Sequence, residues 1–256
     1  MTSWNPEEYL QFADERTRPA SDLLNNIPLS SPSRVIDLGC GTGNSTALLA
    51  ARWPAAHLDA LDSSDAMLTE ARQSGVSANW MLADLATWNP DATYDVIFSN
   101  AAFQWLPDQD KLLPRLMSFV SPKGTFAFQV PSNFNAPSHT ILDDLAEETA
   151  WKGKLKSVRR IQQSSASGYY DIMKPHASSV TIWETEYLQV LAGEDAVYRW
   201  VSGTSLRPFI NVLNSEEREQ FIAAYKTKMN IAYPRRSDGT TLFPFQRIFV
   251  VAAKGS

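Results

Sequence analysis

Val35–Asn44 reads VIDLGCGTGN, an apolar run that ends in three glycines at alternate positions. A segment with apolar residues at helical spacing, up to Trp53, follows directly. Such a turn between a strand and a helix lets a ligand approach the backbone and points free helix N–H groups at it. The stretch therefore predicts a nucleotide-like cofactor at the carboxyl end of a strand. The alternative is that Gly39, Gly41 and Gly43 serve only the geometry of a tight turn.

Around this turn, short apolar runs alternate with segments of helical period, which predicts a wound parallel sheet of an α/β protein. The predicted strands are Arg34–Leu38, His57–Leu61, Asn79–Leu82, Tyr94–Ser99 and Thr125–Val130. The predicted helices between them are Asn44–Trp53, Ser64–Ser74 and Pro107–Val120, with one or two more within Pro6–Asn25.

The alternation stops after residue 131. Two more helices are predicted at Asp143–Ala150 and Glu216–Ile231. Two more strands are predicted at Val180–Leu191 and Phe245–Ala253. The Ser/Gly-rich segment Gln162–Gly168 predicts a loop or lid.

The composition is that of an ordinary globular protein: 44% of the 256 residues are apolar, 20% are charged, and the net charge is −5. This charge disfavours extended nucleic-acid binding. Basic residues outnumber acidic ones only in the carboxyl-terminal half, where we expect the partner of an anion. With Cys40 as the single cysteine, no signal segment and no apolar run of membrane length, we expect a cytoplasmic protein without membrane contact or metal site.

The turn departs from the dinucleotide fingerprint, which requires glycine where Asn44 stands. The negative charge of Asp37, just before the turn, would repel a pyrophosphate but suits a cofactor that carries an ammonium group. A nicotinamide or flavin cofactor is thus disfavoured.

These residues resemble the class I S-adenosylmethionine-dependent methyltransferases, whose first motif has the form E/D-x-G-x-G-x-G. The resemblance implies a Rossmann-like seven-stranded sheet with helices on both faces and an inserted helical cap in the carboxyl-terminal half. It implies S-adenosyl-L-methionine as cofactor, with S-adenosyl-L-homocysteine as product. The implied cofactor-binding residues are Arg16, Asp37, Gly39, Gly41, Gly43, Asp62, Ser63, Asp84, Leu85 and Asn100.

The expected role of each of these residues depends on the strand that it follows. Asp62 follows the second strand at the spacing of an acid that accepts hydrogen bonds from both ribose hydroxyls, although it could instead cap a helix. Asp84 and Leu85 follow the third strand, where the family holds the adenine amino group and covers its ring; Asp84 could instead be a solvated loop acid. Asn100 follows the fourth strand, at the edge of the methyl-transfer site. Arg16 is a candidate for the cofactor's carboxylate, with surface exposure as its alternative.

Along nearly its whole length the chain also resembles the trans-aconitate methyltransferases. The segments that carry this resemblance are 9–12 with 16–20, 99–106, 169–171, 183–187, 203–209 and 243–249, of which the last four are the more specific. It implies monomethyl esterification of trans-aconitate or a related tricarboxylic acid. One methyltransferase domain over 1–256 is then expected, with an N-terminal helical lid (1–28, including Tyr9 and Phe12), a cofactor-binding core (34–131), cap or substrate-binding insertions (133–178 and 192–240) and a final strand (243–253).

A carboxylate is already ionised at neutral pH, so its methylation needs positioning and no general base. No catalytic residue is predicted, and His57, His139 and His176 are isolated in the sequence. Arg207 and Arg247 are the leading anchors for the acid, because each lies among apolar neighbours; an internal salt bridge, for instance with Glu184, is the alternative.

The predicted substrate pocket also contains hydrogen-bonding and aromatic side chains, namely Gln104, Trp105, Tyr169 and Tyr170, with plain core packing as an equal alternative for Trp105. The basic run at 152–160 predicts a solvated face. Arg235 and Arg236 lie in a Pro/Gly-flanked loop with no assigned role.

Three other interpretations of the chain remain open. A methyltransferase that esterifies a malonyl group on a carrier protein would use the same fold, and the basic run would then be a docking face. A non-catalytic cofactor-binding protein is the second alternative, and a nicotinamide oxidoreductase is the third. The sequence does not indicate an oligomeric state.

Overall fold

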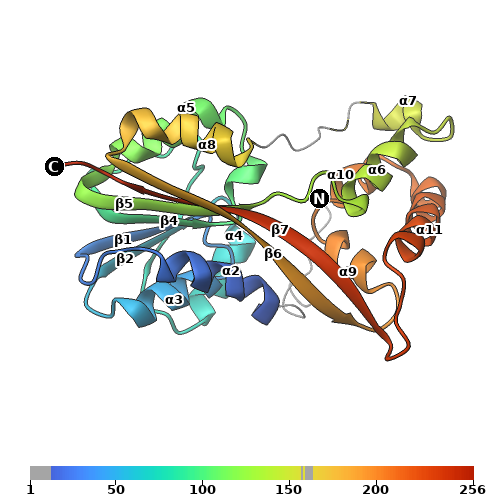
Figure 1. The fold of residues 1–256 in the computed structure, drawn as a ribbon, viewed down its shortest axis with the longest axis horizontal. Coiled ribbons are helices and arrows are strands. Elements are labelled where there is room, and N and C mark those ends of the chain that lie inside the picture. Colours follow the sequence, from blue (N-terminus) through green and yellow to red (C-terminus); the bar gives the residue numbers. More distant parts are fainter. Residues whose placement is uncertain (1–12, 157, 159–163) are drawn as a thin grey trace. The chain divides into compact units, whose positions relative to one another are not determined.

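The structure is a computed structural model that describes residues 13–156, 158 and 164–256. Within these residues, seven strands form one sheet in the order β3-β2-β1-β4-β5-β7-β6, which confirms the predicted seven-stranded sheet (Figure 1). Five strands pair in parallel, and β7 pairs antiparallel with β5. Their bounds are β1 (Arg34–Leu38), β2 (His57–Asp62), β3 (Asn79–Leu82), β4 (Tyr94–Asn100), β5 (Val120–Pro131), β6 (Ser179–Ala192) and β7 (Thr240–Ala253).

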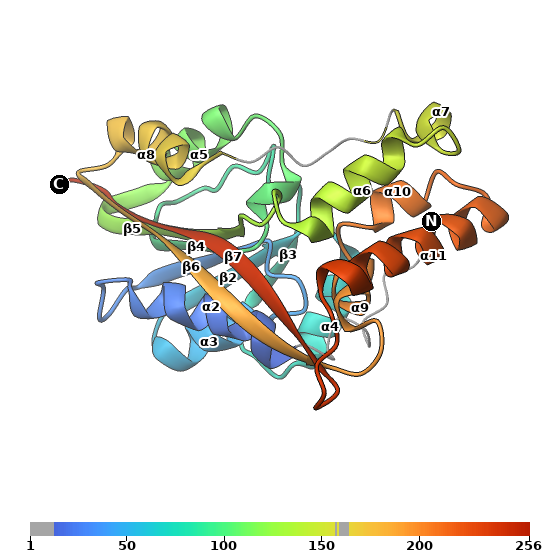
Figure 2. The same ribbon diagram turned by 45° about the vertical axis from the view of Figure 1, so that its right-hand side comes forward.

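Helices cover both faces of this sheet. α2 (Ala13–Asn25) and α3 (Asn44–Arg52) lie on one face, while α5 (Gln109–Ser118) and α8 (Ala166–Met173) lie on the other, as the view in Figure 2 also shows. α4 (Asp65–Gln73) packs against β2 and β3. Because the central strands are covered on both sides, the last four residues of β1 are all buried, the acid Asp37 included.

The chain divides into two compact units. The sheet unit holds β1 to β5, α3 to α5, α8, nearly all of α2, and residues 179–185 and 247–253 of the last two strands. In the part of the chain that the structure describes, the helical unit holds the remaining parts of β6 and β7 and five helices. These are α6 (Pro137–Glu147), α7 (Lys152–Leu155), α9 (Ala196–Ser202), α10 (Arg207–Ile210) and α11 (Ser215–Ala232).

Each unit has its own aromatic core. In the sheet unit, Phe103 packs edge-on against Phe126 and Phe128, with ring centroids 5.8 and 5.3 Å apart. In the helical unit, Phe243 packs edge-on against Tyr233, with centroids 5.3 Å apart. Edge-to-face pairs of this kind add to the stabilisation that burial of the rings provides.

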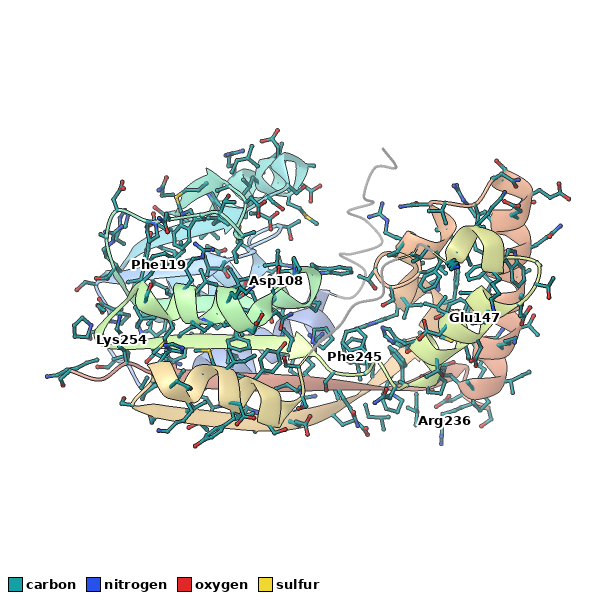
Figure 3. The ribbon with its side chains drawn as sticks, turned by 90° about the horizontal axis from the view of Figure 1, so that it is seen from above. Asp108, Phe119, Glu147, Arg236, Phe245 and Lys254 are labelled. Carbon is teal, nitrogen blue, oxygen red and sulfur yellow. The ribbon has the colours of Figure 1, made fainter. Side chains whose placement is uncertain are left out.

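Lys254 holds the carboxyl-terminal end of α5. Its Nζ donates to the carbonyl oxygens of Ser118 and Val120 at 2.9 and 2.6 Å, and Phe119, the residue at the helix end, is labelled near it in Figure 3. A cation at this position satisfies carbonyls that have no partner inside the helix.

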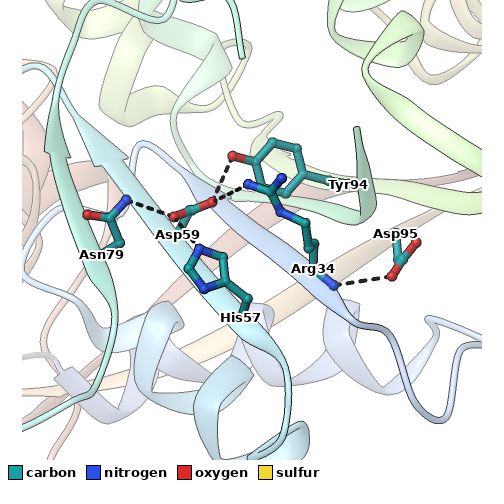
Figure 4. A network of polar contacts seen from close by, with 6 residues as sticks. All are labelled: Arg34, His57, Asp59, Asn79, Tyr94 and Asp95. Atoms are coloured by element: carbon teal, nitrogen blue, oxygen red, sulfur yellow. Dashed lines mark hydrogen bonds and ion pairs between the residues drawn. The ribbon is translucent and has the colours of Figure 1, made fainter. Parts of the chain in front are cut away.

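A polar cluster joins the amino-terminal ends of β1 to β4 (Figure 4). The buried carboxylate of Asp59 accepts from Tyr94 at 2.8 Å, Asn79 at 2.9 Å and Arg34 at 3.4 Å, and it pairs with His57. These four partners offset the cost of burying the acid, since an isolated buried charge would be strongly destabilising. The cluster lies at the opposite edge from the glycine turn, so we assign it a structural role.

The predicted strands and the first helices lie where the sequence places them, but four predictions need correction. β7 begins at Thr240 rather than at the predicted Phe245. β5 begins at Val120, because residues 120–124 extend the strand through an irregularity in its pairing with β4. α6 begins at Pro137, since proline is well suited to the first turn of a helix. The end of the predicted loop Gln162–Gly168 is helical from Ala166, with the Ser165 hydroxyl accepting from the N–H of Gly168. The short helices α9 and α10 were not predicted.

Candidate functional site

The glycine turn leaves β1 at the carboxyl edge of the sheet, beside the point where the strand order reverses between β1 and β4. Gly39, Gly41 and Gly43 all have positive φ, at 73°, 56° and 88°. A Cβ on Gly39 would stand 2.4 Å from Ala102, and one on Gly43 would stand 2.9 Å from the ring of Trp80. A Cβ on Gly41 would meet nothing within 4 Å. Packing therefore explains two of the glycines, whereas Gly41 borders open space that a ligand can enter.

Asp37 lies fully buried beneath this turn. Its Oδ2 accepts from the hydroxyls of Ser45 and Thr46, both at 2.7 Å, while its Oδ1 is buried without a partner among the described residues. Burial raises the pKa of Asp37 to about 6, against the opposing effect of the two hydroxyl donors. The carboxylate thus lies next to the turn and is ready to favour a cation above it.

Asp62, at the end of β2, connects two neighbouring strand tips. Its Oδ2 accepts from the backbone N–H of Gly41 at 2.9 Å, and its Oδ1 accepts from the N–H of Ser64 at 2.8 Å. The N-cap of α4 is Ser64, not Asp62, so helix capping does not account for the acid. A carboxylate has about four acceptor positions, which leaves about two for ligand hydroxyls. Ser63 is exposed beside it.

An arginine that is distant in sequence holds the loop after β3. Arg115 on α5 donates from Nη2 to the carbonyl oxygens of Leu85 and Ala86 at 2.8 and 3.0 Å, and from Nη1 to the carbonyl of Trp88. Asp84 is exposed and accepts from the N–H of Ala86 at 2.8 Å, whereas the Leu85 side chain is packed in the core. Asp84 is therefore available to a ligand, but the buried side chain of Leu85 does not cover one.

A row of three polar side chains runs from the carboxyl ends of β4 and β5 to the middle of β7. Gln129 donates from Nε2 to Oδ1 of Asn100, and Arg247 donates from Nη1 to Oε1 of Gln129 at 3.0 Å. Gln129 and Arg247 are buried, while Asn100 is half-buried. Arg247 thus meets a neutral amide in this row and lies in the sheet unit.

The segment after Asn100 turns sharply. Ala101 has a φ of 57°, and its carbonyl oxygen accepts from Nε2 of Gln104 at 2.6 Å. Gln104 is buried and its Oε1 has no partner among the described residues, whereas Trp105 is 50% exposed. Core packing therefore does not explain Trp105, and an exposed aromatic ring follows Asn100 in sequence.

The two predicted pocket tyrosines have different environments. Tyr169 is fully buried, its hydroxyl donates to Oε1 of Gln109 at 2.7 Å, and its ring packs edge-on against Phe128. This geometry favours a core role for Tyr169 over the predicted contact with the substrate, because the ring and the hydroxyl donor are both engaged in the core. Tyr170, on α8, is 43% exposed.

The remaining predicted residues are spread over the chain. Arg207 is half-buried at the start of α10 in the helical unit. Arg16 belongs to α2, and its side chain lies outside the described part, as do Tyr9 and Phe12. In the basic run, Lys152 pairs with Glu147 at 2.9 Å and Lys154 with Glu217 at 2.6 Å, which agrees with a solvated face. Arg159 and Arg160 lie outside the described residues.

The histidines do not form a catalytic pair with an acid in the described part of the chain. His139 contacts the hydroxyls of Ser138 and Ser205, and burial lowers its pKa to about 4, so the ring is neutral at neutral pH. His57 belongs to the Asp59 cluster. No group of three or more His, Cys, Asp or Glu side chains among the described residues could hold a metal ion.

Sequence reasoning missed Gln129 and Arg115. A glutamine inside the apolar run of a central strand is a signal that could have identified Gln129. Nothing in the sequence pairs Arg115 with the loop at 85–88, because these partners lie far apart along the chain. In the described residues, no helix combines the length and the apolar character that crossing a bilayer requires.

The sequence of this chain is similar to those of known methyltransferases. A family model described as a methyltransferase domain matches residues 35–124. A trans-aconitate 2-methyltransferase from Azoarcus sp. (strain BH72) is 46% identical over 255 residues, covering 99% of this chain and 100% of that protein. Another, from Rhodopseudomonas palustris (strain BisB18), is 43% identical over 256 residues, again covering 99% and 100%.

Solved structures share the fold at much lower identity. The YcgJ protein from Bacillus subtilis aligns with a TM-score of 0.61 at 14% identity, covering 93% of this chain and 99% of that one. Phosphoethanolamine N-methyltransferase 2 from Haemonchus contortus, solved in complex with S-adenosyl-L-methionine, aligns with a TM-score of 0.55 at 14% identity, covering 93% of this chain and 53% of that one.

Proposed function

The chain belongs to the trans-aconitate 2-methyltransferase family, and from this membership we propose that it transfers a methyl group from S-adenosylmethionine to a carboxylate oxygen of trans-aconitate. The products are the monomethyl ester and S-adenosylhomocysteine. The structural observation that carries the proposal is the hydrogen bond between Asp62 and the N–H of Gly41, which brings the turn and the second strand end together around open space.

The residues at this edge fit the cofactor. Gly41 leaves room for a ligand against the backbone, and the remaining acceptor positions of Asp62 suit a pair of ribose hydroxyls. The buried Oδ1 of Asp37 has no partner among the described residues, so a cation above the turn would compensate it. Asp84 is exposed at the next strand tip, where it can accept from the adenine amino group. Ser63 beside Asp62 and Arg16 on α2 complete the proposed set.

The acceptor needs no base from the protein. S-adenosylmethionine supplies an electrophilic methyl group on a positively charged sulfur. A carboxylate oxygen gives its electron pair to the methyl carbon, the carbon–sulfur bond breaks with its pair on sulfur, and no proton moves. The protein therefore contributes alignment and exclusion of water, which can supply several kcal/mol of the barrier.

We assign the acceptor's binding to side chains that follow β4 and to cationic anchors. Asn100, Gln104 and Trp105 lie together along one short segment, and Arg247 is joined to it through Gln129. Arg207 and Tyr170 remain in the proposal on sequence grounds. So do the N-terminal lid at 1–28 and the cap insertions, although residues 164–178 group with the sheet unit. A small anionic partner and a cytoplasmic location also remain part of it.

The test uses the purified full-length chain, S-adenosylmethionine labelled in its methyl group, and a panel of di- and tricarboxylic acids with a malonyl-carrier protein. We expect label to enter trans-aconitate as a base-labile methyl ester. Transfer to the carrier alone would contradict the acid assignment while keeping the reaction class. Binding of cofactor with no transfer to any acceptor would indicate a non-catalytic protein.

The ion pairs of Lys152 and Lys154 reduce the free positive charge available to an acidic carrier.

A further inference from the structure

We infer that Gln129 is a positioning residue. Its carbonyl oxygen accepts from Arg247 and its N–H₂ group donates to Asn100, so that Asn100 presents its own N–H₂ group, and not its carbonyl oxygen, to a carboxylate. This inference rests on the proposed function, because it concerns a carboxylate bound at the end of β4. The carboxylate is that of the acceptor acid or that of the cofactor, and the experiment distinguishes the two.

The register of the sheet places the three side chains in one row. Gln129 on β5 is directly opposite Asn100 on β4, and Pro131 on β5 is opposite Arg247 on β7. Side chains two residues apart on a strand share a face, so Arg247 is the diagonal neighbour of Gln129 on that face. The observed hydrogen bonds follow from this placement.

Arg247 fixes the orientation of both amides. A guanidinium has only donors, so its partner on Gln129 is the carbonyl oxygen Oε1, and Nε2 must face the other way. Nε2 is a donor, so its partner on Asn100 is Oδ1. The direction of each amide is therefore set by the chemistry of the arginine rather than by a choice between two equivalent fits to shape.

The two hydrogen bonds that join Arg247, Gln129 and Asn100 leave the N–H₂ group of Asn100 available. With Oδ1 engaged, the Nδ2 group of Asn100 has no acceptor among the described residues, and the side chain is half-buried at the tip of β4. Two N–H donors backed by a buried arginine favour a carboxylate. The opposite orientation would place a carbonyl oxygen there, which would repel the same group. The orientation that Gln129 imposes on Asn100 thus explains why a glutamine stands inside an apolar strand.

The discriminating variant is Gln129→Glu, which keeps the shape of the side chain but removes its donor. The introduced carboxylate would pair with Arg247, so Asn100 could bind it only by turning Nδ2 inward and Oδ1 outward. The new pair keeps the row satisfied, so thermal stability is expected to stay close to that of the wild type. Asn79→Asp is the control, because it also removes an amide donor, but in the structural cluster at the opposite edge of the sheet.

We measure KM for trans-aconitate, kcat, and the Kd of S-adenosylhomocysteine by calorimetry. If the acceptor's carboxylate binds Asn100, Gln129→Glu raises KM for the acid about tenfold or more with the Kd of S-adenosylhomocysteine unchanged. If the cofactor's carboxylate binds there, the Kd rises instead. Asn100→Asp, which places a carboxylate oxygen at the same position, changes the same parameter in the same direction. Asn79→Asp leaves both parameters unchanged.

Unchanged KM and Kd in a folded Gln129→Glu variant would overturn the inference. If that variant does not fold, Gln129→Met replaces it: methionine gives Asn100 no donor, so the amide of Asn100 is free to reverse and the same parameter is impaired. An unchanged parameter in Gln129→Met would equally overturn the inference. If the wild type methylates no acid, the proposed function fails on that result alone, and the Kd of trans-aconitate, measured by calorimetry with S-adenosylhomocysteine present, replaces KM in the test of Gln129.

Discussion

The carboxylate of Asp62 accepts the backbone N–H of Gly41 at 2.9 Å, a bond between the end of β2 and the turn that follows β1. Two features that the sequence places 21 residues apart are thereby a single unit. The acid shapes the turn and also keeps acceptor capacity for a ligand, so its removal affects both stability and binding.

Replacing Asp62 with alanine should therefore weaken cofactor binding more than it weakens the fold. Two backbone N–H groups lose their acceptor, which costs about 1–3 kcal/mol of unfolding free energy. The Kd of S-adenosylhomocysteine, measured by calorimetry, should rise about tenfold or more because the hydroxyl acceptors are also lost. Asp65→Ala, which removes an exposed acid of the following helix, is the control and should leave the Kd unchanged. Equal Kd values in both variants would remove Asp62 from the site.

Asp37 makes both stability and binding depend on pH. Its folded pKa of about 6 lies above the ordinary value of 3.8, so the native state favours the protonated form. The contribution of this group to stability is complete below the unfolded pKa and is lost as pH rises through about 6, a loss of about 3 kcal/mol. Asp37→Asn should consequently raise the unfolding free energy at about pH 8 but not at about pH 4, because the amide oxygen can still accept from Ser45 and Thr46.

Cofactor binding should follow the opposite trend. The ionised form of Asp37 favours a cation at the turn, so the affinity for S-adenosylhomocysteine, which carries an ammonium group, should increase between about pH 5 and about pH 7.5. Asp37→Asn should flatten this profile. A wild-type profile that is already flat across that range would show that Asp37 does not act on the cofactor.

Arg115 should matter for binding although it lies on a helix away from the turn. Arg115→Met removes the donors to the carbonyl oxygens of Leu85, Ala86 and Trp88, so the loop that carries Asp84 should loosen. We expect the Kd of S-adenosylhomocysteine to rise several-fold. Arg52→Met removes a comparable bond, to the carbonyl of Ile27 at 3.0 Å, and should leave the Kd unchanged. Similar Kd changes in both would point to a general loss of stability.

Tyr169→Phe tests the assignment of this residue to the core. The variant leaves Oε1 of Gln109 buried without its donor, so the unfolding free energy should fall by about 1–3 kcal/mol while KM for the acid stays at the wild-type value. Tyr170→Phe should raise KM for the acid and leave the unfolding free energy unchanged, since Tyr170 is an exposed residue. An increase in KM for Tyr169→Phe would restore the role in substrate binding that the sequence suggested.

The parallel half of the fold was predictable because covered strands are apolar along their length and helices between them have a regular period. The bounds of β1 and β3 agree with the prediction residue for residue. The carboxyl-terminal half offers no such alternation. The four-residue α10 is too short for periodicity to identify, and the start of α8 lies in a Ser/Gly-rich stretch that favours a loop.

Glycines and acids at strand ends identify candidate site residues by type and position, and their role in binding stays a prediction. Sequence could not show which polar atoms are already engaged. The hydroxyl of Tyr169 is bonded inside the core, and the side chain of Leu85 is buried there. It also could not show that Gln129 links Arg247 to Asn100, because that link depends on the pairing of three strands.

The central claim is that the turn at 39–43 and the acid of Asp62 bind the adenosyl cofactor. A calorimetric titration with S-adenosylhomocysteine, run on the wild type and on Gly41→Ala, tests it most directly. At φ 56° an added methyl group costs about 1–2 kcal/mol of strain but meets no protein atom within 4 Å, so the variant should fold. We expect saturable binding to one site in the wild type and at least about a tenfold loss in the variant, because the methyl group enters the space of the ligand. No binding by the wild type, or equal affinity in the two proteins, would contradict the claim.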